Sequence, residues 1–130
     1  MTRDEFNAYC ASLPATNHVV QWGNADVWKV GPKVFAIGGW QDAGDVDPYV
    51  TFKVSDMAYD ILKHQEGLRP APYLASRGMK WIQRYRQDSA MSDADLRTYL
   101  NQSHKLIAQK LTKKLRAELG LRLGLRFSVN

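Results

Sequence analysis

The sequence has few of the residues that small proteins use for covalent or metal stabilisation. One cysteine, Cys10, among 130 residues excludes an internal disulfide and a zinc site built from several cysteines. The three histidines form no His-x-x-x-His or Glu-x-x-His pair, and we expect each of them at the surface or at a boundary. We therefore expect no metal site and no cofactor. A single cysteine also fits a reducing, cytoplasmic compartment.

Long apolar runs and phosphate-binding loops are missing as well. No stretch approaches the roughly 20 apolar residues that a membrane-spanning helix requires, so we expect neither a membrane span nor a secretory signal. Gly38 and Gly39 lack the spacing and the Lys-Ser/Thr of a nucleotide-binding loop. Nothing in the sequence places a base beside Cys10, which we interpret as a small buried hydrophobic residue. The chain is expected to be non-enzymatic.

Helical patterns occur near both ends of the chain. Thr2 and Glu5 form a capping box that predicts a helix over 3–13, which Pro14 ends. Ser92 and Asp95 open the longest predicted helix, which runs to Gly120. Its apolar stripe should pack on a sheet through Leu100, Ile107, Leu111 and Leu115.

Short β-branched and aromatic runs lie between these helices. They predict strands over 18–22, 26–30, 33–39, 48–54 and 79–85, with a short helix from Ser55 to about Gln65. Pro70 and Pro72 make residues 68–74 an extended crossing. The elements predict one α+β domain over 1–120, in which the N- and C-terminal helices pack on one face of an antiparallel sheet of about five strands. Residues 121–130 fit either an edge strand or a disordered tail.

Positive charge is concentrated in the second half of the chain. The net charge is +5, and residues 71–130 hold 12 basic and 4 acidic side chains, against 6 basic and 9 acidic in residues 1–70. Alternation along 79–85 predicts a buried Trp81 and a basic face with Lys80 and Arg84. An ordinary solvated surface and a phosphate-binding face both fit this pattern. The candidate nucleic-acid-binding residues are Arg77, Lys80, Arg84, Arg86, Lys113, Lys114 and Arg116.

The order of several motifs resembles the MmcQ/YjbR family between about Thr2 and Leu119. These motifs are Trp22-Gly23, Trp28 to Val30, Lys33 to Ala36, Pro70 to Leu74, Lys80 to Ile82 and Leu111 to Arg116. The resemblance implies a fold like that of CyaY and frataxin and a double-wing DNA-binding motif, and it supplies no catalytic residue. Frataxin-like iron binding ranks low, because the first helix carries only Asp4 and Glu5 as acids.

Two functional hypotheses follow from the sequence. The first is a small cytoplasmic protein that binds DNA through phosphate contacts at the basic face. The alternative is a protein-interaction or small-ligand-binding module, in which the strand aromatics and the acidic loop expected to be exposed at residues 41–47 form the recognition surface. Binding to random duplex DNA at several salt concentrations discriminates between them, because phosphate contacts weaken steeply as salt rises.

Overall fold

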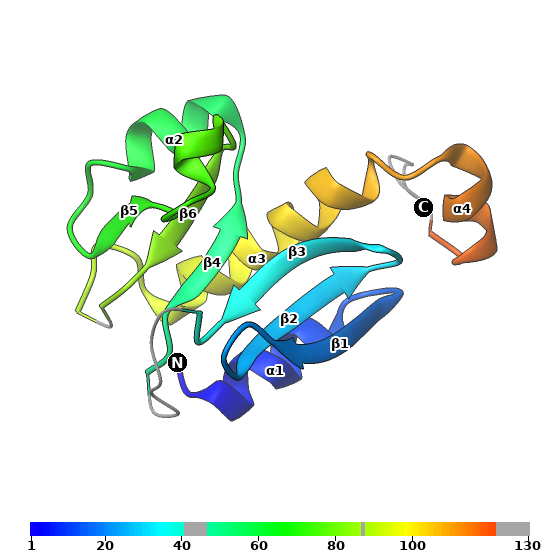
Figure 1. Ribbon diagram of the computed structural model, residues 1–130, viewed down its shortest axis with the longest axis horizontal. Coiled ribbons are helices and arrows are strands. Elements are labelled where there is room, and N and C mark those ends of the chain that lie inside the picture. Colours follow the sequence, from blue (N-terminus) through cyan, green and yellow to red (C-terminus); the bar gives the residue numbers. More distant parts are fainter. Residues whose placement is uncertain (41–46, 87, 122–130) are drawn as a thin grey trace.

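The computed structural model describes residues 1–40, 47–86 and 88–121 and contains a six-stranded antiparallel sheet. The strand order is β1-β2-β3-β4-β6-β5 (Figure 1). The strands are β1 (Thr16–Gln21), β2 (Ala25–Val30), β3 (Lys33–Gly38), β4 (Val50–Lys53), β5 (Leu68–Pro70) and β6 (Trp81–Arg84). The helices are α1 (Arg3–Ser12), α2 (Asp56–Leu62), α3 (Asp93–Ala108) and α4 (Lys113–Glu118), with the 3-10 helix η1 (Ala75–Arg77).

This architecture confirms the predicted α+β class. The sixth strand comes from the predicted crossing, where Leu68 to Pro70 pairs with β6 although Pro70 ends the run. An edge strand tolerates a proline because one side of it needs no ladder partner. The edge strand or tail expected at residues 121–130 lies outside the described residues from residue 122 onward, and residues 41–46 of the expected acidic loop lie outside them as well.

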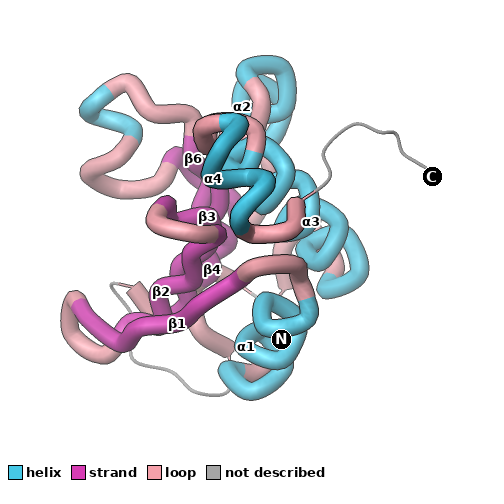
Figure 2. The backbone as a smooth tube through the Cα atoms, turned by 90° about the vertical axis from the view of Figure 1, so that its right-hand side faces the viewer, coloured by secondary structure: helices cyan, strands magenta, loops and turns pink. Residues whose placement is uncertain are grey.

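Helices α1 and α3 pack on the same face of the sheet (Figure 2). Trp28 on β2 donates its indole N–H to Asn7 Oδ1 on α1 at 2.8 Å. Ser103 on α3 donates to the Phe35 carbonyl at 2.6 Å and accepts the Lys53 N–H at 3.0 Å, which ties α3 to β3 and β4. The main core lies between these layers and includes the fully buried Phe6, Phe35, Phe52, Leu96 and Leu100.

The first helix begins as predicted. Thr2 Oγ1 accepts from the Glu5 N–H at 3.1 Å, and the Thr2 N–H donates to Glu5 Oε1 at 2.8 Å, so the capping box is complete. The helix then lies close to β3, because a Cβ on Gly38 would stand 2.5 Å from Phe6 Cε2. Glycine at this position lets the helix approach the strand.

The C-terminal region forms two helices, and the prediction of one helix to Gly120 is wrong. Helix α3 ends at Ala108, and Thr112 begins α4 by accepting the Leu115 N–H at 3.1 Å. A threonine N-cap fixes a new helix start because its own backbone is extended. Leu111 in the link is only 4% exposed, so its predicted burial is confirmed.

Strand β6 departs from the predicted alternation of buried and exposed faces. Trp81 is buried as expected, but Ile82, Gln83 and Arg84 are buried too. Gln83 Nε2 donates to Thr51 Oγ1 at 3.1 Å, and its Oε1 accepts two N–H bonds from Arg69 at 2.7 and 2.9 Å. Both sides of β6 are therefore covered, and it presents no exposed basic face.

Two residues with reactive side chains belong to the core. Cys10 is fully buried, as predicted, and this burial raises the pKa of its thiol far above the usual value. His104 is only 3% exposed, so its expected position at the surface or a boundary is wrong. Its Nε2 lies 2.7 Å from the Pro14 carbonyl oxygen, to which it donates, and its ring packs edge-on against Phe35.

Candidate functional site

The structure divides the predicted basic residues among three places. Arg77 and Lys80 lie just before β6, whereas Arg84 and Arg86 lie at the opposite end of that strand. The other three, Lys113, Lys114 and Arg116, lie on α4. The seven residues therefore do not form the single strand-centred face that the sequence predicted.

Arg84 is an internal structural residue. Its side chain is 3% exposed, and its Nη1 lies 3.0 Å from Asp93 Oδ1. Its Nε donates to Ser89 Oγ at 3.2 Å. The expected exposure of Arg84 is wrong, because β6 is an inner strand whose end is covered by the start of α3.

Arg86 is more exposed than Arg84 but is neutralised by acidic neighbours. Its guanidinium lies 3.3 Å from both Glu66 Oε1 and Asp88 Oδ1, and it also lies over the Tyr85 ring. Carboxylates thus accompany both arginines at this end of β6. The carboxylates at this end of β6 would repel an approaching phosphate.

A different group of cations lies along the border of the sheet that is formed by strand ends, where β4 ends and β6 begins. Because neighbouring strands are antiparallel, Lys33 at the start of β3, Lys53 at the end of β4 and Lys80 before β6 share this edge. In Figure 1, helix α4 and the C-terminal end of α3 lie on the same side of the molecule as the start of β3. We call the following set the basic edge: Lys33, Lys53, Arg77, Lys80, Lys110, Lys113, Lys114 and Arg116.

Helix α4 is held at this edge by packing on the β2–β3 turn. Gly31 in that turn has a φ of +57°, and a Cβ there would stand 3.0 Å from Leu119 Cδ1 and 3.6 Å from Leu111 Cδ1. The apolar side of α4 is thus turned to the sheet. Lys113 and Lys114 are exposed.

Lys53 and Lys110 act on each other electrostatically at the basic edge. Burial lowers the pKa of Lys53, and the nearby Lys110 ammonium lowers it further, while Asp56 acts in the opposite direction. Among the described residues, no carboxylate lies within 4.0 Å of either ammonium. Lysines without a close counterion attract an anion.

An aromatic contact positions the side chain of Lys80. Its ammonium lies 4.7 Å from the centre of the Tyr59 ring on α2. The contact leaves Lys80 half-buried and without a carboxylate within 4.0 Å in the described part of the chain. A cation–π contact orients an ammonium without neutralising its charge.

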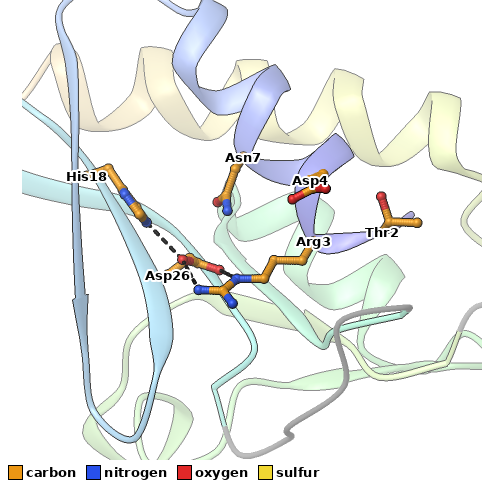
Figure 3. A pocket seen from close by; sticks show the side chains of 6 residues that line it. All are labelled: Thr2, Arg3, Asp4, Asn7, His18 and Asp26. Carbon is orange, nitrogen blue, oxygen red and sulfur yellow. Dashed lines mark hydrogen bonds and ion pairs between the residues drawn. The ribbon is translucent and has the colours of Figure 1, made fainter.

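A polar pocket of about 390 Å³ lies between α1 and the first hairpin (Figure 3). Arg3 Nε and Nη2 donate to Asp26 at 2.7 and 3.1 Å, and His18 Nε2 lies 2.9 Å from the same carboxylate. Burial acts to raise the pKa of Asp26, but the bonds from Arg3 and His18 outweigh it and the pKa is lowered. The other lining residues are Thr2, Asp4 and Asn7.

Polar groups that line this pocket already form hydrogen bonds or stacking contacts within the protein. The Thr2 hydroxyl caps α1, and Asn7 Oδ1 accepts from Trp28. The His18 ring stacks on Trp28 with 4.7 Å between ring centres. Within residues 1–40, 47–86 and 88–121, no group of three or more His, Cys, Asp or Glu side chains could hold a metal ion. The pocket is therefore better explained as part of the packing contact that holds α1 against β2.

The sequence contains no signal for Lys53, and it indicated Lys110 only as one of several basic residues along the predicted C-terminal helix. Each is a single lysine at the end of an apolar element, 57 positions apart in the chain. Only the β3-β4-β6 strand order and the end of α3 at Ala108 bring them together. No local motif could have revealed this pair.

Comparisons with known proteins support the fold. The family model described as YjbR matches residues 11–106. The crystal structure of Deinococcus radiodurans protein DR2400, with the family-model domain DUF419, is similar with a TM-score of 0.76 and 22% identity, covering 99% of this chain and 95% of that one. No curated protein matches the chain. In the described part of the chain, no helix has the length and apolar character needed to cross a membrane.

Proposed function

The chain belongs to the YjbR family, and we propose that it is a non-enzymatic, cytoplasmic protein that binds duplex DNA through phosphate contacts along its basic edge. The carrying observation is the set of eight cations along the basic edge, none of which has a carboxylate in ion-pair distance among the described residues. Phosphates of a duplex would supply the missing negative charge.

The distribution of acids supports the choice of this edge. Glu66, Asp88 and Asp93 lie at the other end of β6, where each forms an ion pair with Arg84 or Arg86. No member of the basic edge forms an ion pair with a carboxylate of the described residues. Asp56 on α2 and Glu118 on α4 lie near this edge, but neither forms an ion pair with its cations, so positive charge remains there to attract a polyanion.

The proposal predicts contacts with phosphates rather than reading of bases. Strand ends, a turn and the short helix α4 supply the cations. Lysine ammonium groups are point charges that bind phosphate without defined base geometry. We therefore expect little sequence preference and strong dependence on salt.

The test is the affinity for a fluorescently labelled random-sequence duplex of 20 base pairs at several salt concentrations. If Lys113 and Lys114 each contact a phosphate, a Lys113→Ala, Lys114→Ala variant should reduce the slope of log affinity against log salt by about 1.8, since each contact contributes about 0.9. Both side chains are exposed, so the melting temperature should not change. An unchanged slope, or no duplex binding at low salt, would reject the proposal.

A further inference from the structure

Three aromatic side chains form a row on the face of the sheet opposite α1 and α3. Trp22 comes from the β1–β2 turn, Trp40 follows β3, and Tyr73 comes from the turn after β5. The ring centres of Trp22 and Trp40 are 6.0 Å apart, and those of Trp40 and Tyr73 are 6.1 Å apart. Trp40 also packs on a small cluster formed by Ala25, Val27 and Ile37. We call these three rings the aromatic row.

The outer two rings are held by unusual backbone conformations. Trp22 has a φ of +54° and Tyr73 a φ of +67°, in the left-handed region that bulky residues rarely adopt. Glycine or asparagine would occupy these turn positions with less strain. The side chains are nevertheless 51% and 69% exposed, so burial does not account for them. Strained positions that present large exposed rings indicate a binding role.

Cations accompany the aromatic row. Arg77 is exposed on η1, four residues after Tyr73, and also belongs to the basic edge. On the same side of the sheet, the Arg69 guanidinium lies over the rings of Tyr85 and Tyr49, at 4.7 and 5.6 Å from their centres. Among the described residues, neither arginine has a carboxylate within 4.0 Å. Flat rings beside uncompensated cations complement a chain of bases and phosphates.

We propose that the aromatic row binds the unpaired bases of single-stranded nucleic acid by stacking, while Arg77 binds a phosphate of the same strand. The inference rests on the proposed function, because the basic edge supplies the phosphate contacts at one end of the row. Stacking requires bases whose faces are free, which a duplex does not offer. The protein should therefore bind a single strand through contacts that a duplex cannot make.

The test is titration with a 15-nucleotide oligothymidine, followed by intrinsic tryptophan fluorescence. Two of the four tryptophans lie in the row, so stacked bases should quench the emission. Trp22→Asn and Tyr73→Asn should each weaken oligothymidine binding by about 5- to 150-fold, the range for loss of one stacked base. Their melting temperatures should stay the same or rise, because asparagine tolerates positive φ. Met57→Gln, at a 75% exposed position on α2, is the control and should bind like the wild type.

Each outcome separates this inference from the proposed function. Duplex binding without oligothymidine binding overturns the role of the aromatic row and leaves the basic edge standing. Equal oligothymidine affinity in the wild type and both asparagine variants also overturns it, since the contacts would then be purely electrostatic. Quenching by a proline-rich peptide but not by oligothymidine would assign the row to a protein partner and overturn it as well. If neither nucleic acid binds, the proposed function fails too.

Discussion

Replacing Arg84 with alanine separates a structural role from a DNA-binding role at one residue. The substitution removes the 3.0 Å ion pair with Asp93 and the 3.2 Å hydrogen bond to Ser89. Loss of one partner of a buried ion pair costs about 3–5 kcal/mol. Because the Asp93 side chain is 34% exposed and the Met1 ammonium remains 3.2 Å from its Oδ1, its charge stays partly solvated and partly paired. We therefore expect the lower end of that range, about 3 kcal/mol.

The assay is thermal unfolding followed by circular dichroism. For a chain of this size, about 3 kcal/mol corresponds to a fall in melting temperature of about 10 °C. Arg86→Ala is the matched control, since it removes the same charge two residues later from a guanidinium that is 41% exposed. Exposed ion pairs contribute about 0–1 kcal/mol, so this variant should melt close to the wild type.

The DNA affinity of the same two variants completes the test. Below their melting temperatures, both should keep the salt dependence of the wild type, because neither residue belongs to the basic edge. If Arg84→Ala melts like the wild type and also flattens the salt dependence, Arg84 would be an exposed phosphate contact. That result would refute the burial argument.

Two further predictions concern the core. Leu111→Ala should lower the free energy of unfolding by about 2–5 kcal/mol, because the side chain is buried in the link between α3 and α4; a denaturant midpoint like that of the wild type would contradict this. Burial lowers the pKa of His104, although its bond to Pro14 acts in the opposite direction, so the unfolded chain takes up a proton at a higher pH than the folded one. Stability should therefore be complete above about pH 6.5 and fall as the pH drops below that value. His104→Gln, measured by urea unfolding at pH 7.5 and 5.5, should lose less stability on acidification than the wild type, and equal losses would reject the assignment.

Local signals predicted the elements of the fold well. The capping residues Thr2 and Ser92 each begin a helix in the structure, because their effect depends only on the next few residues. The break before α4 has a local signal as well, since Thr112 is a typical N-cap. The leucine stripe obscured it, because Leu111 and Leu115 continue the helical spacing across two separate helices.

The candidate site was less predictable because it depends on strand order. Alternation gave Arg84 an exposed position, but the start of α3 covers Arg84, while contacts with Arg69 and Thr51 cover Gln83. Lys53 carries no pattern in the sequence, and only the strand order places it at the same edge as the cations after α3. Charge composition therefore predicted that a basic surface exists, but the folded structure was needed to identify the residues that form it.

The most direct test of the basic edge compares two variants of equal charge. Lys53→Ala, Lys110→Ala removes two cations from that edge. Arg86→Ala, Arg97→Ala removes two from the opposite end of the sheet, where Arg86 follows β6 and Arg97 lies near the start of α3. The affinity for the random duplex is measured for both across the same salt series. The first variant should reduce the slope of log affinity against log salt by about 1.8, and the second should leave it near the wild-type value. Equal slopes for the two variants would contradict a localised DNA-binding edge and leave only a general effect of net charge.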